Sequence, residues 1–134
     1  MRLVLDTNVL IAAFIARGSC AELFEHCARH HVLVTSDFIL AELREQLVGK
    51  FKFSRVEVSE VVMLLLSRML VVQPANLSAR VCRDPDDDEI IATAVAGNCE
   101  CIITGDKDLL VVKRFSGIEI LSPRDFAEYE SRLY

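Results

Sequence analysis

Apolar residues follow two alternating patterns along the chain: short continuous runs, and longer stretches in which they recur every three or four residues. The short runs are typical of buried strands and lie at residues 3–5, 32–35, 70–72, 101–104 and 118–121. The longer stretches predict helices at residues 7–15, 19–31, 37–49, 55–70, 86–97 and 107–110, with a last helix from residue 123.

The predicted helix starts carry polar residues that favour them. Ser19 and Ser36 stand where a side chain can cap the following helix, and Ser122 precedes Pro123, a residue suited to a first helical position. Strands that alternate with helices form βαβ units with right-handed crossovers. The sequence therefore predicts an α/β fold, a three-layer α/β/α sandwich around a mostly parallel sheet of about five strands.

Composition narrows the class of protein. A chain of 134 residues is long enough to bury a core and corresponds to a single domain over residues 1–134. Its 52% hydrophobic residues, 5 glycines and 3 prolines exclude a disordered chain. The longest apolar stretch, residues 61–72, is interrupted by Arg68 well short of the ~20 residues of a membrane span, and no secretory signal is visible. We expect a cytoplasmic protein without a membrane partner.

Cysteine and histidine offer no catalytic pattern. The five cysteines are an odd number without framework or zinc spacing, so we expect reduced thiols that pack in the core. The histidines are His26, His30 and His31, at the end of the second predicted helix, where cations suit the helix dipole. We expect them to form a solvated helix end.

Acidic residues are the strongest chemical signal. Asp6 and Asp106 follow the first and fourth predicted strands, at the edge where open α/β sheets bind ligands. Glu42 lies on or beside the apolar stripe of its helix, and an acidic run at residues 84–89 begins another helix. Like charges brought this close need a cation between them, so the pattern indicates a divalent metal site built from Asp6, Glu42, one of the aspartates at 86–88 and Asp106.

Each of these acids also has an ordinary structural explanation. Asp6 and Asp106 could cap helices, Glu42 could reach water from a boundary position, and an acidic helix start suits the dipole by ~0.3–1 kcal/mol per charge. The acidic run does not fit a calcium-binding EF-hand loop, because Glu89 occupies its glycine position. No P-loop or G-x-G-x-x-G segment is present, so nucleotide binding has no support.

Four segments in order carry a family resemblance. They read LDTNVL at 5–10, SDFILAEL at 36–43, DPDD at 84–87 ahead of IATA at 91–94, and ITGDKDLL at 103–110. With these motifs, the chain resembles the PIN-domain family over essentially its whole length, and within it the toxin-like ribonucleases of the VapC kind. The resemblance implies that Asp6, Glu42, Asp87 and Asp106 bind Mg²⁺ or Mn²⁺ and are catalytic, with Asp88 as the alternative to Asp87. It also makes the small polar residues Thr7, Asn8 and Thr104 candidate substrate-binding supports at the strand ends.

The function implied by the resemblance is hydrolysis of phosphodiester bonds in single-stranded RNA by a metal-dependent endoribonuclease, the toxin of a toxin–antitoxin pair. A net charge of −5 argues against binding RNA by bulk electrostatics, so the metal must hold part of the substrate. Basic residues in predicted loops could flank the groove: Arg17, Lys50, Lys52 and Arg55. The apolar helix at 55–70, or the helix at 19–31, is expected to form a homodimer or to receive a cognate antitoxin.

Two alternatives remain at the level of sequence. A haloacid-dehalogenase-like phosphatase would use Asp6 as its nucleophile, but Asn8 stands where that class has its general acid. A PIN-like binding module without catalytic activity would be expected to have lost carboxylates, and all four motifs keep theirs.

Overall fold

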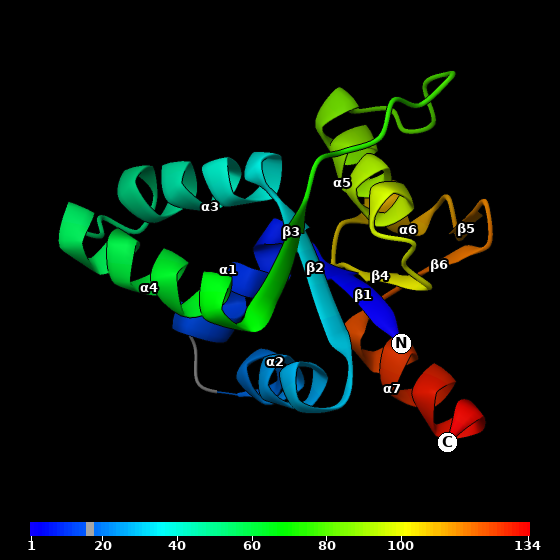
Figure 1. Ribbon diagram of the computed structural model, residues 1–134, viewed down its shortest axis with the longest axis horizontal. Coiled ribbons are helices and arrows are strands. Elements are labelled where there is room, and N and C mark those ends of the chain that lie inside the picture. Colours follow the sequence, from blue (N-terminus) through cyan, green and yellow to red (C-terminus); the bar gives the residue numbers. More distant parts are fainter. Residues whose placement is uncertain (16–17) are drawn as a thin grey trace.

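The computed structural model describes residues 1–15 and 18–134. Its centre is one six-stranded sheet with the strand order β3-β2-β1-β4-β6-β5, in which every pairing is parallel except that between β5 and β6 (Figure 1). The strands are β1 (Arg2–Leu5), β2 (Val32–Ser36), β3 (Met69–Val72), β4 (Cys101–Ile103), β5 (Arg114–Phe115) and β6 (Ile118–Leu121).

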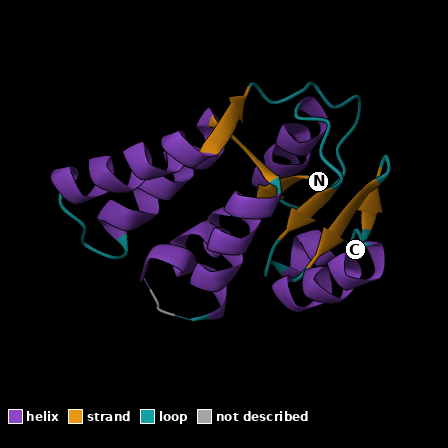
Figure 2. Cartoon of the chain, turned by 60° about the horizontal axis from the view of Figure 1, so that its bottom comes forward, coloured by secondary structure: helices purple, strands orange, loops and turns teal. Residues whose placement is uncertain are grey.

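Helices connect the strands and flank the sheet (Figures 1 and 2). They are α1 (Thr7–Ile15), α2 (Ser19–His30), α3 (Asp37–Gly49), α4 (Arg55–Arg68), α5 (Pro85–Ala96), α6 (Lys107–Leu110) and α7 (Pro123–Leu133). Helix α5 packs against β1, β2 and β4, α7 packs against β6, and α3 and α4 lie side by side as a pair (Figure 1). This architecture confirms the predicted α/β fold with a mostly parallel sheet. No single helix of the described chain is long and apolar enough to span a membrane; α1 and α2 reach that criterion only together, as a bent pair.

The central strands are continuous apolar runs because both of their faces are covered. Leu3, Val4 and Leu5 are fully buried, as parallel strands between two helix layers require. Leu5 stands in register with Ile103, and the Asp6 amide donates to the Ile103 carbonyl at 3.0 Å. Asp6 therefore leaves β1 at the same sheet edge at which β4 ends.

Ser36 and Ser122 cap α3 and α7 as predicted, with side chains that accept hydrogen bonds from Ile39 and Asp125. The prediction for Ser19 was wrong. Gly18 holds the N-cap position of α2, and Ser19 is already the first helical residue.

The sheet has one strand more than predicted. Strand β5 has only two residues and forms an antiparallel hairpin with β6 through Ser116 and Gly117, both of which have positive φ. A two-residue segment is too short to show a period, so the hairpin depends on this turn rather than on an apolar pattern. Helix α4 also ends at Arg68, because Met69 already adopts an extended conformation and begins β3.

The prediction for the cysteines is confirmed. All five are free; Cys20 is half-buried and the other four are buried. Burial raises the pKa of Cys27 and of Cys101 to about 12, so these thiols stay protonated and act as small apolar groups.

The prediction that the histidines form a solvated helix end was wrong for His31. Its side chain is only 3% exposed, because α7 lies against the end of α2 and brings Glu130 onto the imidazole. His26 contacts the same carboxylate.

Candidate active site

The carboxylate of Asp6 is buried at the end of β1, with 5% of the residue exposed. Both of its oxygens accept hydrogen bonds: Oδ1 from the Thr7 amide at 2.7 Å and Oδ2 from the Thr104 hydroxyl at 2.6 Å. The second contact joins residues 98 positions apart in the sequence, which is possible because β1 and β4 are neighbours. The fold therefore fixes the orientation of this side chain from two strands.

Glu42 comes to the same edge from the second turn of α3. Its Oε1 accepts a hydrogen bond from the Thr7 hydroxyl at 2.5 Å. Thr7 thus contacts both acids, Asp6 through its amide and Glu42 through its side chain. Thr7 and Thr104 are themselves buried and orient carboxylates, whereas Asn8 is exposed. Substrate binding by Thr7, Asn8 and Thr104 stays a prediction.

At the start of α5, the side chains of the neighbouring residues Asp87 and Asp88 have different surroundings. Asp84 caps this helix by accepting from the Asp86 amide at 2.9 Å. Asp88 then turns outward and accepts from the amides of Val81 and Cys82 at 3.2 and 2.7 Å. Asp87 instead is 8% exposed and lines the same pocket as Asp6. Of the two candidates, the structure brings Asp87 to the other acids.

Asp106 caps the short helix α6 beyond β4. Its Oδ1 accepts from the Asp108 amide at 2.9 Å, and its own amide donates to the Thr104 hydroxyl at 3.0 Å. Carboxylate oxygens of Asp87, Asp106 and Asp108 lie within 4.8 Å of one another. Asp108 is absent from the residues predicted for the site; its spacing of two residues from Asp106 was the available signal.

One small pocket of about 120 Å³ lies at the carboxyl edge of the sheet and is lined by Asp6, Glu42, Asp87 and Asp106. All four predicted carboxylates contribute to it. Its lining residues are Asp6, Thr7, Asn8, Glu42, Gln46, Asp84, Asp86, Asp87, Ile90 and Asp106. Within the described part of the chain, neither lysine nor arginine lines the pocket.

Comparison with known proteins identifies the family. The family model described as the PIN domain matches residues 2–108. The chain belongs to the PIN-domain family. The matched segment contains all four predicted carboxylates, so the phosphatase alternative loses its basis. A protein of unassigned function from Methanocaldococcus jannaschii, MJ1680, is 29% identical over 119 residues, which cover 84% of this chain and 76% of that protein.

Solved structures share the fold of this PIN domain. A chain of the VapBC2 structure from Rickettsia felis, bound to a DNA fragment from its promoter, superposes with a TM-score of 0.62 at 20% identity and covers 90% of this chain and 97% of that one. A chain of VapBC-1 from nontypeable Haemophilus influenzae gives 0.65 at 19% identity, with 92% and 99% covered. At these identities, the similarity establishes the fold alone.

Electrostatics in the pocket of the PIN domain oppose ionisation. Burial, and next the charge of Asp106, raise the pKa of Asp87 to about 7. Burial also raises the pKa of Asp6 and of Glu42 above their ordinary values, although hydrogen bonds from Thr104 and Thr7 act in the opposite direction. Three acids with raised pKa values around one pocket are typical of a functional site rather than of helix caps.

The donor set fits a hard divalent cation. The charged side chains among the described residues that line the pocket are all carboxylates. Carboxylate oxygens are the ligands that Mg²⁺ and Mn²⁺ prefer. Asp87 Oδ2 is buried and has no hydrogen-bond partner among the described residues. A buried carboxylate oxygen without a partner is costly, and a cation at this position would satisfy it.

Of the four basic residues expected beside the groove, the three that the structure describes lie elsewhere. Lys50 and Lys52 follow the far end of α3, in the loop that leads to α4 (Figure 1), and Lys50 lies over the ring of Phe51. Arg55 lines a separate groove between α3 and α4. Arg17 lies outside the described residues. The lysines therefore do not line the acidic pocket.

Proposed function

We propose that this PIN domain is a metal-dependent endoribonuclease that hydrolyses single-stranded RNA, and that it is the toxin of a toxin–antitoxin pair. The observation that carries the proposal is the unpartnered, buried Oδ2 of Asp87 in a pocket whose other acids are Asp6, Glu42 and Asp106. We infer that these four residues hold Mg²⁺ or Mn²⁺, through oxygen ligands alone.

The chain itself supplies position and charge. A divalent cation, when bound, offsets negative charge on the phosphoryl oxygens and activates water for in-line attack. Thr104 and Thr7 keep the Asp6 and Glu42 carboxylates directed into the pocket through the hydrogen bonds described above. Among the described residues that line the pocket there is no serine, cysteine or histidine, and the Thr7 hydroxyl is engaged with Glu42, which agrees with direct hydrolysis by water.

Recruitment of a polyanion by an acidic protein also depends on the cation. The four carboxylates repel RNA when the pocket is empty, and a bound cation reduces that charge locally. Asn8, exposed at the rim, is suited to donate and accept hydrogen bonds with a nucleotide. This arrangement supports an RNA that reaches the pocket as a flexible single strand rather than as a stiff duplex.

An antitoxin and a second copy of the chain are the proposed protein partners. Large apolar side chains are exposed on one helix and on the edge strand beside it: Val56, Met63, Leu64 and Leu66 on α4, and Leu70 and Val71 on β3. Apolar groups that gather on neighbouring elements are typical of interaction surfaces. The structural similarity to chains of two VapBC assemblies adds support for a partner of this kind.

The test is a cleavage assay on single-stranded RNA with and without Mg²⁺ or Mn²⁺. Asp6→Asn and Asp87→Asn are expected to reduce the rate at least ~10²-fold, because each removes a charged metal ligand. Glu42→Gln tests the acid on α3, and Glu45→Gln, an exposed change one turn along the same helix, serves as its control. Cleavage that survives a chelator, or that is equal in Asp87→Asn and wild type, would refute the proposal.

A further inference from the structure

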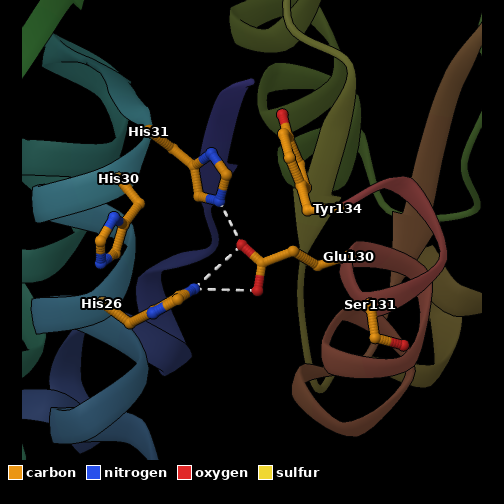
Figure 3. Close-up of a pocket in the computed structure, with 6 residues that line it drawn as sticks. All are labelled: His26, His30, His31, Glu130, Ser131 and Tyr134. Carbon is orange, nitrogen blue, oxygen red and sulfur yellow. Dashed lines mark hydrogen bonds and ion pairs between the residues drawn. The ribbon is translucent and has the colours of Figure 1, made fainter.

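A second cluster of metal-ligating side chains lies away from the carboxylate pocket, where α7 meets the end of α2 (Figure 3). His26 Nε2 lies 2.8 Å from Glu130 Oε1 and 2.9 Å from Oε2, and His31 Nε2 contacts the same carboxylate. Donor atoms of all three residues lie within 4.8 Å of one another. His26 lies on α2 and His31 directly follows that helix. Their imidazoles converge on a carboxylate of α7 that lies 104 and 99 positions later in the sequence.

His31 is held in one orientation. Its ring packs edge-on against Phe126, with centroids 6.0 Å apart, and lies 6.1 Å from the Tyr134 ring. Its Nδ1 lies 3.1 Å from the Met1 amino nitrogen, an ammonium group that can only donate, and its Nε2 faces Glu130. Because its ring packs against two aromatic rings, His31 loses little freedom when it binds a metal.

Glu130 is a charged ligand. Burial alone would raise its pKa, but hydrogen bonds from His31 and His26 outweigh burial and hold the pKa below its ordinary value. Its side chain is 19% exposed, and that of His26 is 44% exposed, so solvent reaches the cluster from the His26 side.

The cluster borders a cavity of about 360 Å³, which has room for an ion and a further ligand. His30 also lines this cavity, and its ring centroid lies 4.8 Å from that of His26 (Figure 3). Among the described residues, no lysine or arginine lines the cavity. A cation could therefore approach from solvent without displacing a basic side chain, and the positive group next to the cluster is the Met1 ammonium at His31 Nδ1.

We propose that His26, His31 and Glu130 form a transition-metal site, selective for Zn²⁺ over Mg²⁺, with a fourth position open to solvent or to His30. Two imidazoles and one carboxylate suit a borderline-soft ion with tetrahedral preference, whereas the all-oxygen pocket suits hard ions. The ion would lie between the two Nε2 atoms and the Glu130 carboxylate, in place of the hydrogen bonds that now join them.

The consequence of this site is structural. Phe126 is the only buried residue of α7, and its ring packs edge-on against His31. A metal bridge between His26, His31 and Glu130 would fasten the C-terminal helix to the body of the domain. The site is independent of the proposed nuclease activity and can be tested without it.

The test is calorimetric titration of the full chain with Zn²⁺, under reducing conditions and in excess Mg²⁺ so that hard cations occupy the carboxylate pocket. We expect one Zn²⁺ per chain, and a rise in Tm of roughly 10 °C at a hundredfold excess over Kd. The absence of a saturable Zn²⁺ site, or of any rise in Tm, would overturn the proposal.

Variants locate the bound ion. Loss of a residue that only supports a metal ligand typically weakens metal binding ~10–100-fold. Glu130→Gln and His26→Gln each change a direct ligand, so we expect them to weaken Zn²⁺ binding by more than this. Glu128→Gln on the exposed side of α7 should bind like wild type. His26 is largely exposed, so its variant tests the site without threatening the fold. Wild-type affinity in both ligand variants, or loss of Zn²⁺ binding in Asp87→Asn, would place the ion elsewhere and refute the assignment.

Discussion

Replacement of Asp87 by asparagine should stabilise the metal-free protein while it removes metal binding. The pKa of Asp87 is raised from 3.8 to about 7. At ~1.4 kcal/mol per pH unit, this corresponds to at most ~4 kcal/mol of unfavourable free energy when the folded protein carries the ionised group. The pocket is open to water, and screening reduces the expected gain for Asp87→Asn to ~2 kcal/mol at pH 8. The variant also no longer carries a buried, charged oxygen such as Oδ2, which has no partner within residues 1–15 and 18–134.

The gain depends on pH in a defined direction. Because the folded pKa lies above the unfolded value, wild-type Asp87 is protonated and harmless below about pH 4. Its unfavourable contribution grows as pH rises from about 4 to about 7 and is constant above. The difference in free energy of unfolding between Asp87→Asn and wild type should therefore be near zero at pH 4 and reach its full value at pH 8.

Urea denaturation in EDTA at several pH values measures this difference, and repetition with Mg²⁺ measures the metal effect. Wild type should gain stability from Mg²⁺, whereas Asp87→Asn should gain little. Asp37→Asn, an exposed change in the first turn of α3, is the control and should alter stability by less than ~1 kcal/mol at either pH. An Asp87→Asn protein that is no more stable than wild type at pH 8 in EDTA, or equally stabilised at pH 4, would show that ionised Asp87 does not destabilise the metal-free fold.

Three further changes test other parts of the account. Thr104→Val removes the donor to Asp6 and the acceptor for the Asp106 amide, and should lower the free energy of unfolding in urea by ~1–3 kcal/mol; an unchanged value would contradict the supporting role. Gly97→Ala places a Cβ 2.7 Å from a Val34 methyl group, and overpacking should lower the Tm through a loss of ~1–3 kcal/mol. Met63→Glu should convert a proposed homodimer to monomers in light scattering, and a wild-type protein that is already monomeric would refute the dimer.

Local patterns predicted most of the fold, because they reflect local physics. Continuous apolar runs identified the strands that helices cover on both faces, and Ser36 and Ser122 identified helix starts. The hairpin between β5 and β6 was not predicted, because the two residues of β5 are too few to show a repeating apolar pattern. Ser19 was misassigned as a cap because a serine suits both the cap and the first helical turn.

The parts of the site that depend on contacts between distant segments could not be predicted from the sequence. The strand ends placed Asp6 and Asp106 correctly, since parallel neighbours end at one edge. The choice between Asp87 and Asp88 depended on the phase of α5, which the Asp84 cap and the amides of residues 81–82 determine. The buried contact of His31 could not be predicted, because it depends on how α7 docks against α2.

Acids from four distant segments converge on one pocket, where we propose that they hold a divalent cation. Anomalous diffraction from crystals of the full chain soaked in Mn²⁺ would locate this ion. We expect a Mn²⁺ peak in the pocket, bonded to carboxylate oxygens of Asp87 and at least one of Asp6 and Asp106. A pocket that stays without a peak at Mn²⁺ concentrations that support RNA cleavage would contradict it.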